Sequence, residues 1–228
     1  MKKLAMFLGL MLSVNFVYSQ SNERIPLTPF EKVIVSGNIQ VYMNQGEREE
    51  ARVNVRGIDR DKLQMEVQGR TLKIKLGLFD QVKDSEIRVN VTYSQIREIQ
   101  LSSGAQMEFA EPLDAGYLKV SASTGSSARL EGKYNTLEVR AVSGSIVSIA
   151  GEAELLEATA NTTAEIKGSG FVCRDGVLQA HTGARIEAEV THSADVTAGT
   201  TGEVILKGNP AKERISTGTG GTVTRLKP

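Results

Sequence analysis

The sequence predicts an all-β protein, a single-stranded parallel β-helix or β-solenoid in which coils of short strands stack on one another. Three observations carry this prediction. Apolar and polar residues alternate from Phe30 to Tyr93, and this is the period of a β-strand. A Ser/Thr-Gly turn then recurs about every 19 residues. The 22 Gly and the aromatic content of only 5% indicate tight corners and a core of small side chains.

Length and composition restrict the possible functions. The 228 residues include 27 Lys and Arg against 27 Asp and Glu, so the formal net charge is zero. This balance argues against binding to nucleic acid or to an anionic membrane. A single Cys excludes an internal disulfide and a multi-cysteine zinc site. A hydrophobic content of 40% with 5 Pro excludes a disordered chain.

Residues 1–19 have the pattern of a secretory signal peptide. Two Lys precede an apolar run over residues 4–17, and small residues precede a cleavage point before Gln20. The run is shorter than the roughly 20 apolar residues of a membrane-spanning helix. No Cys follows it, so we do not expect a lipoprotein. We expect an exported bacterial protein, periplasmic, cell-surface or extracellular, with no transmembrane segment after cleavage.

Residues 20–98 predict a less regular β region that caps one end of the solenoid. Gly-containing groups such as Ser36-Gly37-Asn38 separate the strands, because Gly accepts the positive φ that a reversal requires. The segment from Ile58 to Leu63 carries four charges and is expected to be a loop or a short helical turn. The alternating runs are Val33–Val35, Ile39–Met43, Val53–Val55, Leu63–Val67, Leu72–Leu76 and Ile87–Val91.

Residues 99–228 contain a repeat. Its marker is a tripeptide with Ser or Thr first and Gly second, and successive central residues are 21, 19, 19, 20, 19 and 19 positions apart. Leu, Val and Ala recur seven, five and three residues before the central position. We expect the central glycines to form a ladder of stacked corners, with Ser/Thr hydroxyls available to bond neighbouring turns. These glycines are Gly104, Gly125, Gly144, Gly183, Gly202 and Gly221, and Thr163 occupies a degenerate copy.

The repeat predicts coils of about 19 residues that stack about 4.8 Å apart. The Ala column indicates a narrow interior. A β-sandwich of hairpins also has regularly spaced turns, but the repeated Leu, Val and Ala columns favour the solenoid. Parallel β connections favour a right-handed coil. We predict residues 20–228 to be one continuous domain, whose last coil carries edge-protecting cations at Arg225 and Lys227.

The segment from Phe30 to Val41, FEKVIVSGNIQV, resembles the opening of the family called putative auto-transporter adhesin, head-GIN domain. The Gly-Arg-Thr-Leu-Lys-Ile motif over residues 69–74 and the repeated Ser-Gly turns are similar too. The resemblance covers the chain from about residue 30 to the end. It implies an exported β-solenoid of the kind common in envelope proteins of Bacteroidetes-type bacteria, without a settled biochemical function.

Candidate catalytic chemistry is sparse, and we predict no catalytic residue, no metal site and no cofactor. His181 and His192 could form a metal site with a nearby carboxylate, but the favoured interpretation is two separate residues that face solvent. The sequence has no Gly-x-Ser-x-Gly elbow. Cys173 is expected to be a buried free thiol, because Arg174 is its only basic neighbour.

A ligand site is expected in the first half or the early coils, because the aromatic residues that sugars favour lie there. Stacking could also bring Arg140 close to Glu157 and Thr159 on one face. The candidate ligand-patch residues are Tyr42, Tyr93, Tyr117, Tyr134 and Arg140.

The predicted function is that of a non-enzymatic exported cell-envelope protein, an adhesin or a scaffold that acts through a rigid solenoid surface. The alternative is a carbohydrate-binding or polysaccharide-processing β-helix protein, and processing would need clustered carboxylates with a cation in a groove. The expected partner is a surface glycan or an envelope protein. Nucleic acid is not expected, and the oligomeric state is not predicted.

Overall fold

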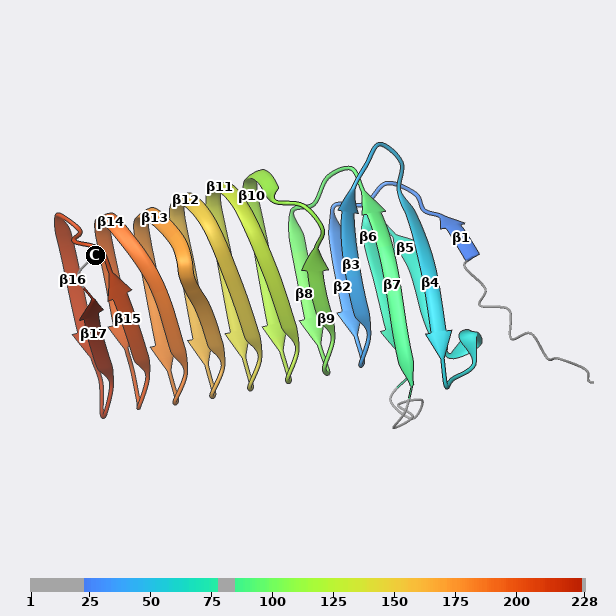
Figure 1. Ribbon diagram of the computed structural model, residues 1–228. Helices are drawn as coiled ribbons and strands as arrows, with labels where there is room; N and C mark the ends of the chain where they lie inside the picture. Colours follow the sequence, from blue (N-terminus) through green and yellow to red (C-terminus); the bar gives the residue numbers. More distant parts are fainter. Residues whose placement is uncertain (1–22, 78–84, 227–228) are drawn as a thin grey trace, which may run out of the picture.

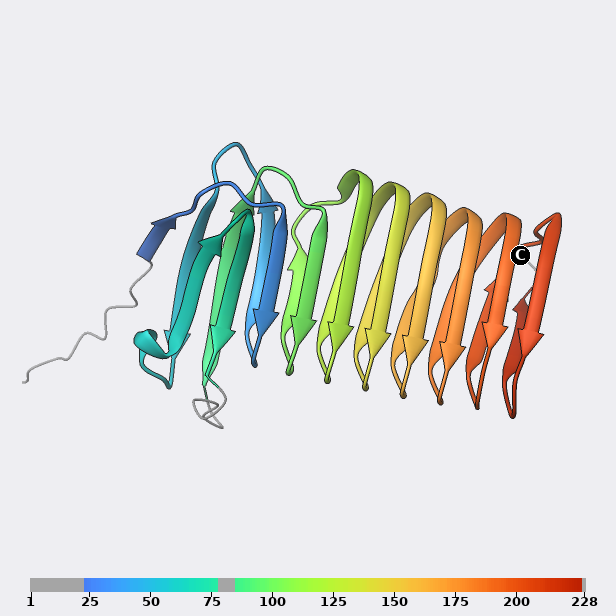
Figure 2. The same cartoon turned by 180° about the vertical axis from the view of Figure 1, so that it is seen from behind.

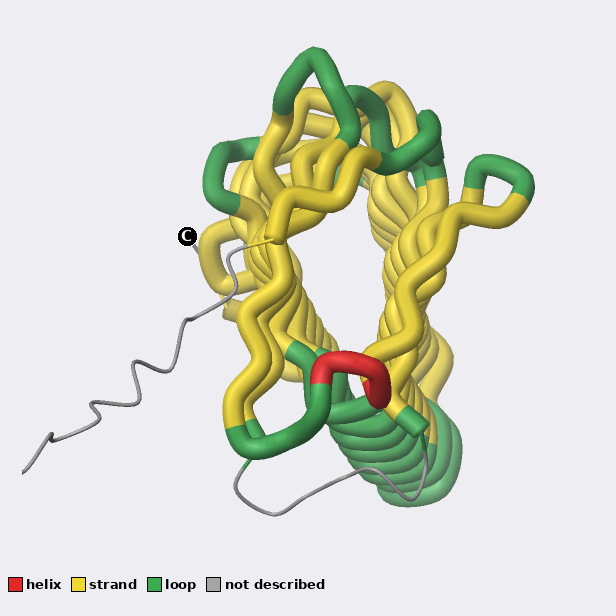
Figure 3. The backbone as a smooth tube through the Cα atoms, turned by 90° about the vertical axis from the view of Figure 1, so that its right-hand side faces the viewer, coloured by secondary structure: helices red, strands yellow, loops and turns green. Residues whose placement is uncertain are grey.

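Two walls of β-strands face each other across a narrow core in the computed structural model (Figures 1 and 3). The structure describes residues 23–77 and 85–226, so the predicted signal peptide over residues 1–19 lies outside the described residues. No helix in the described ranges is long and apolar enough to cross a membrane. The elements are β1 (Glu23–Pro26), β2 (Lys32–Ser36), β3 (Gln40–Gln45), β4 (Glu50–Arg56), η1 (Arg60–Lys62), β5 (Leu63–Gln68), β6 (Thr71–Leu76), β7 (Glu86–Tyr93), β8 (Glu98–Ser102), β9 (Gln106–Phe109), β10 (Leu113–Ser123), β11 (Ser127–Val142), β12 (Ile146–Asn161), β13 (Glu165–His181), β14 (Arg185–Ala198), β15 (Glu203–Lys207), β16 (Lys212–Thr217) and β17 (Thr222–Leu226).

Each regular coil consists of one long bent strand and one tight corner. Strands β11 to β14 run along one wall, bend, and return along the other wall, where a corner leads to the next coil (Figures 1 and 2). We call the wall that leads into the corners wall A; it contains β5, β6, β2, β8, the later parts of β10–β14, and β16. Wall B leads away from the corners and contains β1, β4, β7, β3, β9, the earlier parts of β11–β14, β15 and β17. The predicted all-β solenoid is confirmed.

The N-terminal coils do not stack in chain order. The coil of β2 and β3 lies between the coil of β6 and β7 and the coil of β8 and β9, with parallel pairing on both sides. Segment 94–97 therefore carries the chain from β7 to β8 past an intervening coil. Beyond β6 and β7, strands β5, β4 and β1 extend the two walls by antiparallel pairs at this end (Figure 3). Of the two alternatives predicted for residues 58–63, a loop or a short helical turn, the structure has the helical turn η1.

Columns of identical or similar side chains fill the core. On wall A, Leu118 pairs with Leu137, which pairs with Leu156, as the repeat predicts. The predicted Ala column lies beside the corners, and its members are no more than 1% exposed. Larger buried side chains on wall B belong to the same hydrophobic core and compensate for the small size of these Ala residues. The Ala column is Ala122, Ala141, Ala160, Ala180 and Ala198, and the wall B column includes Val147, Ile166, Ile186 and Val204.

The corners of the first repeats are turns with two consecutive positive φ angles. Ser103 and Gly104 have φ of 57° and 80°, and the N–H of Ala105 donates to the carbonyl of Ser102 at 3.2 Å. This is the geometry of a type I′ turn, which Gly accepts at the least cost. Successive corners bond through the backbone, since the N–H of Gly104 donates to the carbonyl of Thr124 at 3.0 Å. The same pair of angles occurs at residues 124–125, 143–144, 162–163 and 182–183.

Two of the six predicted corner glycines are out of phase with the ladder. Strand pairing places Gly202 beside Ala184 and Gly221 beside Gly202, one position after the corner. The positive φ angles belong to Thr201 and Gly220. Gly is needed at 202 and 221 for a different reason, because a Cβ there would lie 2.2 and 2.0 Å from a carbonyl oxygen of the preceding coil.

Hydroxyl groups stabilise the corners from a position that the sequence did not indicate. The buried Ser145 follows Gly144, accepts a hydrogen bond from the N–H of Val142 and donates to the carbonyl of Ala122, each at 2.9 Å. Ser126 bonds in the same manner one coil earlier. The predicted role of hydroxyls thus belongs to the residue after Gly in these two coils.

The last coil ends the core with an ion pair in place of apolar side chains. Glu213 follows Ala194 in the column that begins with Leu118, and Arg225 follows Leu206 on the opposite wall. The Arg225 Nε donates to Glu213 Oε1 at 3.0 Å, so the pair spans from wall B to wall A across the end of the core. Inward-pointing charges discourage edge pairing with another chain. Arg225 thus lies at the edge that we predict it to protect, and Lys227 lies outside the described residues.

Replacing Thr163 with Gly should stabilise the protein. Thr162 and Thr163 are consecutive β-branched residues with φ of 52° and 56°, and a left-handed conformation costs an L-residue about 1–2 kcal/mol. We expect Thr163→Gly to raise the free energy of unfolding by about 1 kcal/mol in urea denaturation. The control Thr159→Gly removes a mid-strand side chain and should lower it. A loss of stability in both variants would contradict this account of the corner.

Removing the terminal ion pair should make the solenoid associate end to end. The double variant Glu213→Leu/Arg225→Leu keeps the net charge and leaves an apolar core end, which we expect to produce a concentration-dependent increase in mass by light scattering. The matched control Asp195→Leu/Arg214→Leu removes an exposed pair on the outer surface, where the nitrogen and oxygen lie 3.7 Å apart. Equal association of both variants, or of neither, would be inconsistent with a protective role for the pair.

Candidate functional site

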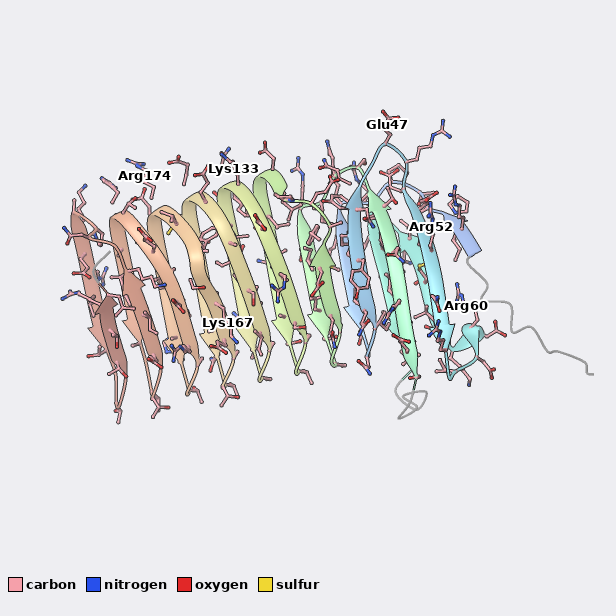
Figure 4. All side chains as sticks on the ribbon, viewed as in Figure 1. Glu47, Arg52, Arg60, Lys133, Lys167 and Arg174 are labelled. Atoms are coloured by element: carbon pink, nitrogen blue, oxygen red, sulfur yellow. The ribbon has the colours of Figure 1, made fainter. Side chains whose placement is uncertain are left out.

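A groove follows the ridge where the long strands bend from wall B back to wall A. Its first hollow, of about 510 Å³, lies between segment 94–97 and the beginning of β10, with Gln45 at the end of β3. A second hollow, of about 390 Å³, continues over the bends of β11, β12 and β13. Both are lined by Asp114, Ala115 and Gly116, so they adjoin at this segment, and we call the two hollows together the ridge groove. Lys133 and Arg174, which line the second hollow, project from this ridge in Figure 4.

Backbone hydrogen bonds fix the first hollow in place. Segment 94–97 crosses the ridge because β7 and β8 lie on opposite sides of the β2–β3 coil. The N–H of Arg97 donates to the carbonyl of Glu31 at 2.8 Å, and the N–H of Lys119 donates to the carbonyl of Arg97 at 2.9 Å. The N–H of Gly46 donates to the carbonyl of Tyr93 at 2.9 Å. The crossing segment is thus held both to the N-terminal coils and to the first long strand.

Tyr117 supplies an exposed aromatic ring at the edge of the first hollow. The residue is 44% exposed, and its hydroxyl donates to Glu138 Oε2 at 2.9 Å. Lys119 Nζ donates to the other oxygen of Glu138 at 2.7 Å. This bond from Lys119 lowers the pKa of Glu138, and partial burial together with the bond to Glu138 raises the pKa of Tyr117. The ring therefore has a fixed orientation and stays protonated at neutral pH.

Outward charges in one column of wall A alternate in sign over four neighbouring coils. Lys32, Glu98, Lys119 and Glu138 occupy one column of paired positions. Lys32 Nζ lies 2.9 Å from Glu98 Oε1, and Lys119 Nζ lies 2.7 Å from Glu138 Oε1. Burial alone would raise the pKa of Glu98, but hydrogen bonds from Lys32 and Gln100 lower it. These four charges form two ion pairs and neutralise one another, whereas the next position in the column, Glu157, is again acidic.

The five residues of the predicted ligand patch do not come together. Tyr42 lines a hollow of about 260 Å³ on wall B, whereas Arg140 lines one of about 200 Å³ on wall A. Tyr93, Tyr117 and Tyr134 line the ridge groove, but Tyr93 and Tyr134 are only 3% and 4% exposed. Among these five tyrosine and arginine positions, Tyr117 alone combines exposure with the groove.

Tyr93 and Tyr134 belong to the core beneath the groove. The ring of Tyr93 packs edge-on against Phe109 with centroids 5.8 Å apart, and Tyr134 lies 6.4 Å from Phe171. Burial raises the pKa of Tyr93 to about 12 and also raises that of Tyr134. The Tyr134 hydroxyl is buried and has no hydrogen-bond partner within the described ranges. The predicted surface role of these two rings is therefore wrong, because both complete the packing under the ridge.

Sequence reasoning missed most of the groove lining. Gln45, Gln95 and Arg97 come from the end of β3 and the crossing segment, and Asp114 and Gly116 come from the start of β10. The unusual coil order brings them together, and no local motif marks them. The signal for this lining was segment 94–97 between two strands, in which Ser94, Gln95 and Arg97 are polar, but its neighbours in space could not be deduced from the sequence.

The histidines and the cysteine lie in separate environments. His192 Nδ1 is 2.7 Å from Asp175 Oδ1, and this hydrogen bond lowers the pKa of Asp175. His181 is near the corners of wall A, where it neighbours Asn161. Cys173 is 1% exposed, and burial raises its pKa to about 12. Within the described part of the chain, no group of three or more His, Cys, Asp and Glu side chains could hold a metal ion.

Comparisons with known proteins agree with this fold. Residues 29–210 match the model of the family described as putative auto-transporter adhesin, head GIN domain. Putative adhesins from Bacteroides fragilis and Parabacteroides distasonis have similar structures, each with 16% identity over 90% of this chain and 95% of theirs, and with TM-scores of 0.78 and 0.74. A Parabacteroides distasonis protein described as a putative lipid binding protein has 15% identity, the same coverages and a TM-score of 0.69. No curated protein matches the chain.

Cys173 should be unreactive in the folded protein. Its thiol is buried, donates to the carbonyl of Glu189 at 3.4 Å and has a pKa raised to about 12, so little thiolate forms near neutral pH. We expect no labelling by Ellman's reagent at about pH 8 in the native state and one thiol per chain after denaturation, since the chain has a single Cys. Rapid native labelling would show that the thiol is accessible.

Proposed function

Because the chain belongs to the putative auto-transporter adhesin, head GIN domain family, we propose that it is an exported, non-enzymatic protein of the bacterial cell envelope that adheres to surface components. The observation that carries this proposal is the rigid, two-walled solenoid with a preformed groove along one ridge. A preformed surface favours binding because little conformational entropy is lost when a partner docks.

The continuous strand pairing supports a rigid surface. Strands β11 and β12 pair in parallel from Ser127 and Ile146 to Val142 and Asn161, and β13 continues the same stacking. A long strand with neighbours on both sides has little freedom to open locally. Side chains on the walls and on the ridge are therefore held at fixed spacings, and this suits recognition of an extended partner.

The balance of surface charges supports binding through shape and hydrogen bonds, and not through net electrostatic attraction. Ion pairs link adjacent coils on both walls and on the ridge, as Lys119 with Glu138, Lys207 with Glu187 and Lys133 with Glu152 show. Opposite charges at such short distances cancel at longer range, so electrostatic steering of a charged partner would be weak. Adhesion should accordingly depend little on salt.

The acid-base chemistry near the ridge supports a non-enzymatic role. A glycosidase needs a carboxylic acid with a raised pKa beside an ionised carboxylate. Three carboxylates on the ridge side of wall A and at the adjoining bend have lowered pKa values: Glu98, Glu138 and Asp175. Each of these remains ionised at neutral pH and is suited to an ion pair and not to proton donation.

The test is a binding assay with the secreted, mature protein. Labelled protein should bind saturably to intact Bacteroidetes-type cells or to immobilised mucin, and excess unlabelled protein should compete. Raising the salt concentration should change the bound amount little. Absence of competable binding to every surface would contradict adhesion, and release of reducing sugar from envelope polysaccharide would contradict the non-enzymatic role.

A further inference from the structure

We propose that the ridge groove binds an uncharged glycan, with its pyranose rings lying along the ridge and one ring stacked on Tyr117. This inference rests on the proposed adhesive function and names the ligand class of its main surface feature. Four features of the groove support it: its size, its exposed aromatic ring, a glycine that the fold does not require, and polar side chains without partners.

The groove has the size and the direction of an oligosaccharide site. Its two hollows, of about 510 and 390 Å³, each lie within the roughly 300–1,000 Å³ typical of ligand pockets. They join at Asp114–Gly116 and follow the stacking direction across the bends of β11, β12 and β13. Coils are about 4.8 Å apart, a distance comparable with the length of one sugar ring, so equivalent positions on successive bends could contact successive units of a glycan.

Gly116 keeps the floor of the groove open beside Tyr117. Its φ is not positive, and a Cβ there would meet nothing closer than Asn135 Nδ2 at 3.8 Å. The fold therefore does not require Gly at this exposed position. The missing side chain leaves free space next to the exposed ring of Tyr117, and a sugar ring can pack its apolar face on such a ring.

Polar side chains around the first hollow lack partners. Gln45, Gln95 and Arg97 line this hollow, and their side chains make no hydrogen bond or ion pair with any described residue. Amide and guanidinium groups offer several donors, and the amides also offer acceptors, which suits the hydroxyls of a sugar. The buried, unpartnered Tyr134 hydroxyl adds a further polar group beneath the second hollow.

Charge along the groove favours an uncharged ligand. Cations and anions are equal in number among the lining residues, and Lys133 Nζ is paired with Glu152 Oε1 at 2.8 Å. An acidic polysaccharide would meet as many carboxylates as cations and would gain no net attraction. The charged lining residues are Arg97, Asp114, Lys133, Glu152, Glu154 and Arg174.

The experiment measures retardation of the mature protein in native gels that contain one soluble polysaccharide each: laminarin, barley β-glucan, xyloglucan or mannan as uncharged probes, and polygalacturonate or hyaluronan as anionic probes. We expect at least one uncharged polysaccharide to retard the protein and the anionic ones not to. Gly116→Gln should abolish retardation by filling the groove. The matched control Gly170→Gln changes another exposed glycine, on wall B, where a Cβ would have its nearest contact at 3.9 Å, and should bind like the wild type.

Two further variants separate the ring of Tyr117 from its hydroxyl. Tyr117→Ala should weaken binding about tenfold or more, whereas Tyr117→Phe should remain within about threefold because it keeps the stacking surface. Equal thermal unfolding of all variants shows that folding is not the cause. Retardation that survives Gly116→Gln, or that occurs with anionic polysaccharides alone, would overturn the proposal, as would absence of retardation by every probe. If cells or mucin still bind the protein in that case, the glycan inference fails while the adhesive function stands.

Discussion

The stacking of parallel strands in register is the constraint on which the rest of this structure depends. Neighbouring strands lie about 4.8 Å apart, so each side chain sits directly against its counterpart in the coils before and after it. Side chains at the same position in successive coils must therefore be able to pack against one another or to form pairs. Leu137 lies between Leu118 and Leu156 in the core, and Lys119 meets Glu138 outside. One rule thus produces a packed interior, a balanced surface charge and a rigid shape.

The same rule explains how much of the fold could be predicted. Because each coil repeats the last, the period of about 19 residues and the Leu, Val and Ala columns were visible in the sequence. The position of Gly202 and Gly221 relative to the corners was not visible in it. The chain shortens by one residue before Thr201, so that the core partners Ile186 and Val204 stay aligned and the Gly moves out of the corner. Core packing decides the register, and the turn adapts to it.

The N-terminal coil order could not be predicted, for a related reason. An alternating strand such as β2 can pair equally well with any similar strand, so its position between β6 and β8 depends on contacts between distant segments. The lining of the ridge groove follows from that order. The burial of Tyr93 and Tyr134 could not be predicted either. A sequence identifies an aromatic residue, but it does not show whether neighbouring segments cover its ring. Both rings are covered, whereas Tyr117 is not.

The ridge groove lies where the regular stacking of coils is interrupted, and this interruption leaves polar side chains available for binding a ligand. In the regular coils several outward charged side chains find a partner one coil away, as Lys133 finds Glu152 and Lys119 finds Glu138. Segment 94–97 breaks the repeat, so Gln95 and Arg97 have no counterpart in the next coil to bond with. The exposed ring of Tyr117 and these polar side chains therefore lie together at the interruption, where one ligand could contact all of them.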